Sequence, residues 1–362
     1  MLAGCGGRAP HLVVGAVEDA AKNGDGPRKL ELARRAGFEA IVLSSVWTPP
    51  LTRPTEPELA ALRGAVEAAT AEDVRPIVAV YQFSGVTPLT PAARAEFSAY
   101  AASIPRLLPE VRDVIVGNEP NLNLFWMPQF GPDGQDAAAA AYLPLLAQSY
   151  DALKAVSSDV NVIGGAVSFR GSDDPAGERQ THSPTQFIRD LGAAYRASGR
   201  DRPVMDMFSL HPYPENSSIP PDFAHPRSTT IGLADYGRLV SLLGEAFDGT
   251  AQPGSKLPIV YGEYGVQTQI PPAKQRVYTG FEQPAVKAVD EATQGAYYAQ
   301  AIRIAACSPN VRMLLFFHVF DEFQRQRLQT GVYYADGTPK PDLATVAEAA
   351  REAESGKVQC AS

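Results

Sequence analysis

The chain has 362 residues, 45% of them apolar, and this length and composition suit one large folded domain with a sizeable core. Its formal net charge of −8 and its lack of any dense Lys/Arg run exclude the electrostatic footprint of a protein that binds nucleic acid or anionic lipid. No run approaches the roughly 18 to 20 apolar residues of a membrane-spanning helix, so we expect no membrane-spanning segment. The expected ligand is neutral or weakly charged.

The N-terminus begins with Leu2-Ala3-Gly4-Cys5, which resembles the lipobox of bacterial lipoproteins, where Cys5 would be acylated. The charged and apolar regions that precede such a cleavage site are missing from the sequence, which would place its start inside a signal sequence. The alternative is a disordered segment of small residues over 1–10, followed by the folded domain over 11–362. Both interpretations stay open at this point.

Short β-branched apolar runs alternate eight times with stretches of helical periodicity. The expected strands are 11–17, 40–46, 75–81, 113–117, 161–167, 205–211, 258–262 and 313–319. The expected helices are 28–36, 57–71, 91–108, 137–156, 184–197, 231–246, 291–306 and 341–352. Nearly all the strands are continuously hydrophobic, which is typical of parallel strands covered on both faces. The pattern predicts an α/β fold, a single-domain TIM (β/α)8 barrel. An open doubly wound sheet is the alternative, but no glycine-rich phosphate loop follows the first strand.

The connections after the fourth to seventh strands are long and rich in Pro, Gly, Asn and aromatic residues, whereas the turns from helix to strand are short. In a barrel these long connections build up one face, at the C-terminal ends of the strands, where functional residues are found. Such loops favour a walled pocket over an open cleft.

Two apolar strands end in a glutamate on this face. The fourth strand runs into Asn118-Glu119-Pro120, and the seventh into Gly262-Glu263-Tyr264-Gly265. Cleavage of a glycosidic bond needs two carboxyl groups, one to protonate the leaving oxygen and one to attack or stabilise the anomeric carbon. Strands four and seven lie on opposite sides of the barrel, so their side chains can approach to about 5 Å, the separation expected for retention of configuration.

With this pair of glutamates the sequence resembles the clan A glycoside hydrolases, whose barrels carry Asn-Glu at the end of strand four and a nucleophilic Glu at the end of strand seven. The resemblance extends from about 11 to 341. It implies that Glu119 is the acid/base, that Asn118 binds the sugar 2-hydroxyl, and that Glu263 forms the glycosyl-enzyme intermediate. It further implies a hydrolase of β-linked glycosides that needs no cofactor. A transglycosylase with the same glutamates and a non-catalytic carbohydrate-binding barrel stay open as alternatives.

Strand six ends in Ser209-Leu210-His211-Pro212-Tyr213, which resembles the family segment that supports the nucleophile. We expect Tyr213 to donate a hydrogen bond to Glu263 and so favour its charged form. His211 is expected either to contact the sugar or to lie in the core with one ring nitrogen bonded to backbone.

Strand eight departs from the family, since Phe317-His318 stands where a Trp often forms the floor beneath the sugar. Either side chain is a candidate floor. A metal site formed by His318 with Asp321 or Glu322 is disfavoured because no second His shares its face.

The other strand ends offer further side chains that suit sugar binding, where planar polar groups fix hydroxyls and aromatic rings cover C–H surfaces. The candidates are Glu18, Trp47, Tyr81 and Gln82, with Phe125 and Trp126 as an aromatic wall for the leaving group. Glu18 as a salt-bridge partner at the barrel rim, and Trp126 as a loop-packing residue, are the alternatives.

Cys307 and Cys360 form a possible pair that would tie down the C-terminal tail, with two unpaired thiols as the alternative. A disulfide would agree with the lipobox in indicating an extracytoplasmic, bacterial protein that is secreted or lipid-anchored. The sequence thus predicts an exo-acting retaining glycosidase of carbohydrate metabolism, acting on short glycosides.

Overall fold

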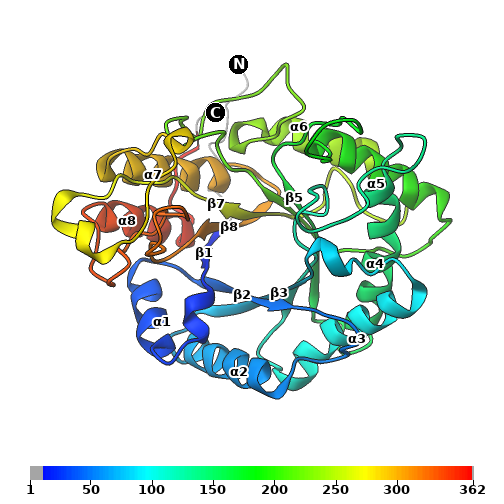
Figure 1. The fold of residues 1–362 in the computed structure, drawn as a ribbon, viewed down its shortest axis with the longest axis horizontal. Helices are drawn as coiled ribbons and strands as arrows, with labels where there is room; N and C mark the ends of the chain where they lie inside the picture. Colours follow the sequence, from blue (N-terminus) through cyan, green and yellow to red (C-terminus); the bar gives the residue numbers. More distant parts are fainter. Residues whose placement is uncertain (1–10, 361–362) are drawn as a thin grey trace, which may run out of the picture.

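The computed structural model describes residues 11–360, so the lipobox-like segment around Cys5 lies outside the described residues. Within this range, parallel strands close into a barrel in the order β1 to β8, and helices surround it (Figure 1). The predicted TIM barrel is confirmed. The strands are β1 (Val13–Val17), β2 (Ala40–Val46), β3 (Arg75–Tyr81), β4 (Asp113–Val116), β5 (Asn161–Ser168), β6 (Met207–His211), β7 (Ile259–Tyr264) and β8 (Val311–Phe317).

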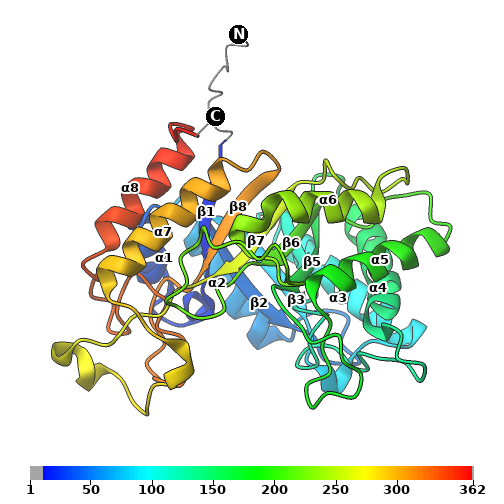
Figure 2. The same cartoon turned by 90° about the horizontal axis from the view of Figure 1, so that it is seen from above.

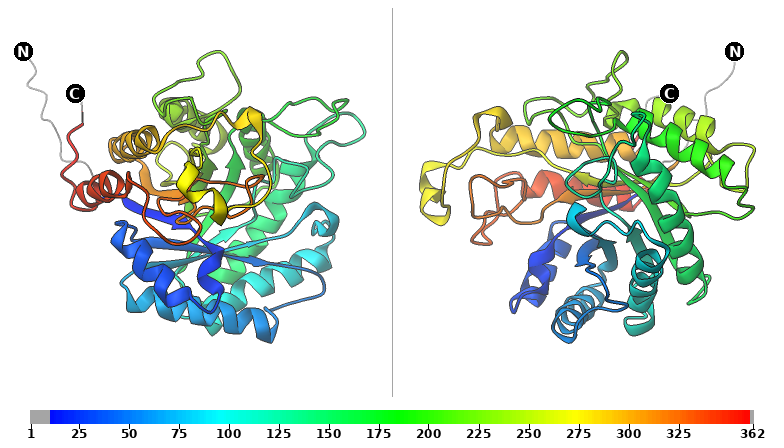
Figure 3. Two further views of the ribbon diagram at one scale, coloured as in Figure 1. Left: turned by 60° about the vertical axis from the view of Figure 1, so that its left-hand side comes forward. Right: turned by 45° about the vertical axis from the view of Figure 1, so that its right-hand side comes forward.

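The helices alternate with these strands and pack on the outside of the barrel, as two further views show (Figure 3). They are α1 (Gly26–Arg35), α2 (Glu56–Ala71), α3 (Pro91–Leu107), α4 (Ala137–Lys154), α5 (Pro184–Ala197), α6 (Tyr236–Phe247), α7 (Glu291–Ala306) and α8 (Leu343–Glu354). The local sequence determines where several of these helices begin. The Ser183 side chain, for example, accepts a hydrogen bond from the backbone of Gln186, with Pro184 at the first helical position.

Side chains fill the barrel in two shells. Val17, Val42, Ile77, Ile115 and Val260 belong to the inner cluster. A larger outer cluster lies between the strands and the helices. The ring is closed by β1 and β8, whose residues pair from Val13–Met313 to Val17–Phe317. Alternate residues of each strand therefore face the axis or the helices, and this alternation decides which strand-end side chains reach the mouth of the barrel.

Long loops gather at the C-terminal ends of the strands. The loop after β7 (265–290) projects from the body of the barrel and is drawn in yellow in Figure 2. The loop after β8 (318–342) is also long, and it bridges to the β7 loop between Thr279 and Gln324. A buried ion pair between Lys340 and Asp321, 2.8 Å apart, anchors the β8 loop.

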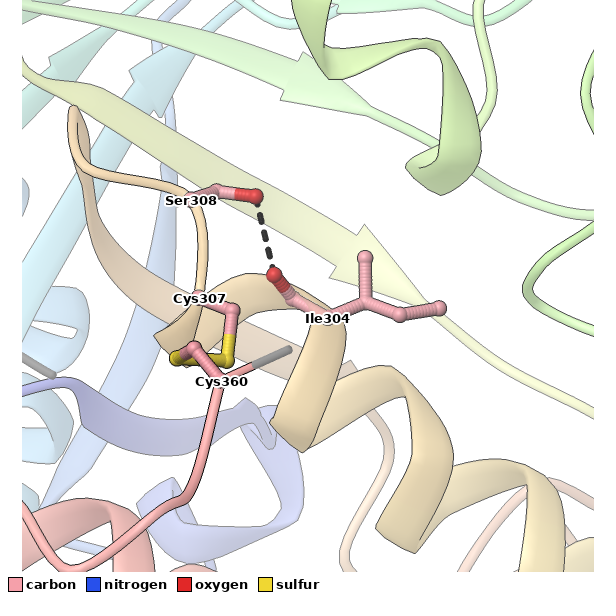
Figure 4. Close-up of a disulfide and its surroundings, with 4 residues drawn as sticks. All are labelled: Ile304, Cys307, Ser308 and Cys360. Atoms are coloured by element: carbon pink, nitrogen blue, oxygen red, sulfur yellow. Dashed lines mark hydrogen bonds between the residues drawn. A yellow bond between two sulfur atoms is a disulfide. The ribbon is translucent and has the colours of Figure 1, made fainter. Parts of the chain in front are cut away.

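The C-terminal tail is joined to the end of α7 by a disulfide between Cys307 and Cys360 (Figure 4). The pairing considered from the sequence is therefore present. Across residues 11–360, no helix combines the length and the apolar character needed to cross a membrane.

Candidate active site

A cavity of about 290 Å³ opens at the C-terminal end of the barrel, and both predicted catalytic glutamates line it. Its walls come from the ends of every strand except β5 and from the loops that follow them, as expected for this fold. The lining residues are Val17, Asp19, Val42, Ser44, Ala79, Tyr81, Phe83, Ile115, Asn118, Glu119, Leu124, Phe125, His211, Gly262, Glu263, Phe317 and His318.

Glu119 stands on a sharp turn immediately after β4. Gly117 has φ +85° and Glu119 itself has φ +37°, a left-handed conformation that side-chain-bearing residues seldom adopt. The turn is held by hydrogen bonds from the Glu119 amide to the Ala166 carbonyl and from the Leu122 amide to the Glu119 carbonyl, both 2.8 Å. This backbone directs Asn118 and Glu119 together into the cavity, as predicted.

Glu263 reaches the cavity because β7 is irregular. Strict alternation would put Glu263 on the same side as Tyr261, which packs in the outer cluster. The pairing with β8 shifts register between Tyr261 and Tyr264, and Tyr264 also lies in the outer cluster. In a regular strand, residues three positions apart face opposite sides, yet Tyr261 and Tyr264 both face outward. The alternation is therefore interrupted between them, and Glu263 faces the mouth of the barrel, where it lines the cavity.

His211, at the end of β6, lies between the two glutamates. Its Nδ1 is 3.2 Å from Glu119 Oε1 and 3.7 Å from Glu263 Oε2. Because one nitrogen atom contacts both, these two oxygens are at most about 7 Å apart. The partners of this nitrogen are carboxylates and not backbone, and because His211 also lines the cavity its contact with a sugar stays a prediction.

Gly262 makes this close approach possible. A Cβ atom at Gly262 would lie 2.4 Å from Ser209 Oγ and 3.1 Å from His211 Nε2. A larger residue would therefore push β6 away from the strand that carries Glu263.

Tyr213 donates a hydrogen bond of 3.0 Å to Glu263 Oε2, as predicted. Burial raises the pKa of the Glu263 carboxyl above its ordinary value, and the negative charge of Glu119 raises it further. The positive charge of His211 and the hydrogen bond from Tyr213 lower the same pKa, but burial outweighs them. Burial alone would lower the pKa of His211, but the two carboxylates outweigh it and the pKa is raised. The ionisations of the glutamates and the histidine thus depend on one another.

Phe317 and His318 form the part of the wall where the family often has a Trp. Their rings lie 3.9 Å apart between centroids, and both line the cavity. His318 Nδ1 is 2.9 Å from the Val17 carbonyl, which can only accept, so Nδ1 carries the proton. The other nitrogen, Nε2, lies 3.9 Å from Glu322 Oε2.

An aromatic wall follows β3 and β4. Tyr81 and Phe125 meet edge to face, and Phe83 stacks on Phe125 at 5.6 Å between centroids. Tyr81 and Phe125 were expected here, whereas Phe83 and Leu124 were not identified from the sequence. Phe83 is exposed although apolar, a property that sequence alone does not reveal.

The two tryptophans predicted to bind substrate do not reach the cavity, and both predictions are wrong. Trp47 is fully buried in the outer cluster, packs edge to face on Phe97, and donates from Nε1 to the Leu51 carbonyl. Trp126 is also fully buried and packs edge to face on Tyr142. In β2 the even-numbered residues face the barrel axis and the odd-numbered ones, such as Leu43, face the helices. Trp47 also has an odd number, so this alternation could have placed it correctly.

Gln82 and Glu18 bond to backbone groups and do not line the catalytic cavity, although Glu18 lines a second cavity beside it. Buried Gln82 donates from Nε2 to the Phe125 carbonyl and so supports the aromatic wall. The Glu18 carboxylate accepts hydrogen bonds from the amides of Ala20, Val319 and Phe320, which joins the ends of β1 and β8. The suggested ion pair for Glu18 is replaced by these amide contacts.

The acids near His318 are occupied by other partners. Asp321 is buried and accepts hydrogen bonds from Lys340 and Tyr278, so it is turned away from His318. Over residues 11–360, no three His, Cys, Asp or Glu side chains are grouped so that they could hold a metal ion.

Comparison of this structure with solved structures finds similar folds among glycoside hydrolases. A family 39 glycoside hydrolase from Bacteroides cellulosilyticus superposes with a TM-score of 0.66 at 20% identity, covering 95% of this chain and 64% of that protein. An exo-β-1,4-mannosidase from an Opitutaceae bacterium gives 0.60 at 16% identity, covering 98% and 61%. A monomeric β-xylosidase from Caulobacter crescentus gives 0.58 at 16% identity, covering 94% and 69%.

This chain has the barrel fold of these glycoside hydrolases. It spans less than two thirds of the length of the first two. No protein-family model matches the sequence, and no curated protein matches it either. The fold that the resemblance implied is confirmed by these superpositions.

Proposed function

We propose that the protein is a retaining glycoside hydrolase that cleaves β-linked glycosides by double displacement. The observation that carries the proposal is the contact of both strand-end glutamates with His211 Nδ1, at 3.2 and 3.7 Å, inside the cavity at the C-terminal face. Two carboxyl groups that approach one nitrogen atom this closely support double displacement, which needs an acid/base and a nucleophile close to one another.

In the first step Glu119 donates its proton to the glycosidic oxygen while Glu263 attacks the anomeric carbon. The bond to the leaving group breaks, an alcohol departs, and a glycosyl ester forms on Glu263. The contacts of Tyr213 and His211 with Glu263 favour the carboxylate form that attack requires.

In the second step Glu119, now a carboxylate, removes a proton from water, and the resulting oxygen nucleophile attacks the anomeric carbon of the ester. Glu263 leaves as a carboxylate and the sugar is released with its original configuration. Asn118, which lines the cavity beside Glu119, is assigned to the sugar 2-hydroxyl, as the family resemblance implies.

A panel of aryl β-glycosides tests this function, with the Glu263→Gln variant as control. We expect the wild type to release the aryl group from at least one sugar and the variant to be slower by several orders of magnitude. If both are equally inert across glucosides, xylosides and mannosides, the hydrolase proposal fails. Addition of azide to Glu263→Ala should give a glycosyl azide of inverted configuration. The same product from Glu119→Ala instead would reverse the two roles.

We also propose that the protein acts outside the cytosol. The disulfide between Cys307 and Cys360 supports this, since such bonds persist in oxidising compartments. Mass spectrometry of protein from its native host, alkylated before reduction, tests the proposal: recovery of both cysteines as alkylated thiols would contradict it.

A further inference from the structure

A second and larger cavity, of about 770 Å³, opens beside the catalytic one. It lies between the end of β1 with the start of α1 on one side and the loop after β8 on the other. Asp19 and His318 line both cavities, so the two adjoin. Its volume lies within the range of about 300–1,000 Å³ that is usual for ligand pockets.

The position of this cavity relative to the glutamates decides which part of a substrate could enter it. The acid Glu119, at the end of β4, must stand beside the glycosidic oxygen, so the leaving group is assigned to the β4 side of the cavity, across the ring from β8 and β1. The sugar attacked by Glu263 then lies on the other side, over Phe317 and His318. Beyond His318 the second cavity begins, on the glycone side.

The walls of the second cavity combine an aromatic face with polar side chains. Phe323 is 55% exposed at its rim and offers a ring against which a sugar can stack. Asn23 and Gln324 also line it and supply amides for hydroxyl groups. An exposed ring among planar hydrogen-bonding groups is the combination that carbohydrate surfaces require.

The cations that line this cavity are already paired. Three cations line it, each with an acidic partner: Arg28 with Glu31, Lys29 with Asp25, and Arg327 with Glu322. A uronate or sulfate would have to compete with these partners, whereas a neutral sugar needs no counter-charge. The walls therefore suit neutral sugars.

We propose that this second cavity is a binding subsite for a neutral sugar attached to the glycone, so that the enzyme prefers substrates with at least two sugar units on that side of the scissile bond. The proposal rests on the hydrolase function given above. It also refines the exo action expected from the sequence, since the unit released would be a disaccharide or longer.

Matched aryl glycosides test this subsite: 4-nitrophenyl glucoside against cellobioside, xyloside against xylobioside, and mannoside against mannobioside. For the sugar that is hydrolysed, we expect kcat/KM for the disaccharide to exceed that for the monosaccharide by about tenfold or more. Phe323→Ala and Asn23→Ala, which change opposite walls, should each reduce this ratio. A ratio taken within one variant is insensitive to the fraction of folded protein.

Phe281→Ala is the matched control, because Phe281 is 63% exposed and lies outside both cavities; its ratio should equal that of the wild type. A wild-type ratio near one, with the monosaccharide still hydrolysed, would overturn the subsite and leave the proposed function standing. A ratio unchanged in both Phe323→Ala and Asn23→Ala would also overturn it. If the wild type hydrolyses no glycoside faster than Glu263→Gln does, the proposed function and the subsite are both overturned.

Discussion

Replacing Tyr213 by Phe removes a single hydroxyl group and should slow hydrolysis and shift its pH dependence. The phenol donates a 3.0 Å hydrogen bond to Glu263 Oε2. A hydrogen bond to a charged acceptor contributes about 1.5–3 kcal/mol, which corresponds to one to two pKa units at about 1.4 kcal/mol per unit. Because this bond favours the carboxylate, its loss raises the pKa of Glu263 further.

The rate kcat/KM depends on Glu263 being ionised, so the acidic limb of its pH profile should move to higher pH by about one unit or more in Tyr213→Phe. The profile is measured with an aryl β-glycoside over roughly pH 4 to 9. Tyr264→Phe is the matched control: Tyr264 follows Glu263 in β7, and its buried hydroxyl has no hydrogen-bond partner among the described residues. The reasoning is refuted if Tyr213→Phe keeps the wild-type acidic limb and a kcat/KM within about twofold of wild type.

Three further predictions follow from other contacts. Asn118→Ala should lose about 2–4 kcal/mol of transition-state stabilisation toward a normal glycoside but be nearly equal to wild type toward the 2-deoxy analogue; equal losses on both would exclude a role at the 2-hydroxyl. Cys360→Ser opens a link to Cys307 across a sequence separation of 53 and should lower the free energy of unfolding by about 2–4 kcal/mol in denaturant titrations, whereas an unchanged midpoint would show that the link stabilises nothing. Burial raises the pKa of Asp342 to about 7, and neither carboxylate oxygen has a partner among the described residues. The folded state therefore binds the extra proton, stability falls as pH rises from about 4 to 7, and Asp342→Asn should raise Tm at pH 8 more than at pH 5; an equal effect at both would contradict this.

Much of the fold could be predicted because the apolar composition of the strands and the turn residues beside them indicate the same strand boundaries. The runs 40–46 and 75–81 were predicted with the bounds that β2 and β3 have. β7 was predicted to end at Gly262 but continues to Tyr264, since its register shift with β8 lies beyond what periodicity reveals. The helix expected from 231 begins instead as a short 3-10 turn over Leu233–Asp235 before α6.

The candidate site was predictable where a residue type and a strand end coincide, as for Glu119 and Glu263. Tyr213 was also placed correctly, because the resemblance supplied its partner. Trp47 was misplaced because the alternation of β2, which turns its odd-numbered residues outward, was not extended to it. Trp126 lies in the loop after β4, where no alternation indicates side-chain direction and only the space left in the packed barrel defines it.

The central claim is that Glu263 forms a covalent bond to the sugar. Incubation with the 2-deoxy-2-fluoro analogue, carrying a good leaving group, of whichever β-glycoside is hydrolysed should trap this ester, because fluorine slows its breakdown. Peptide mass spectrometry of the inactivated protein is predicted to show one added fluorosugar, on Glu263. Attachment to Glu119, or turnover without any labelled peptide and with a product of inverted configuration, would contradict the account.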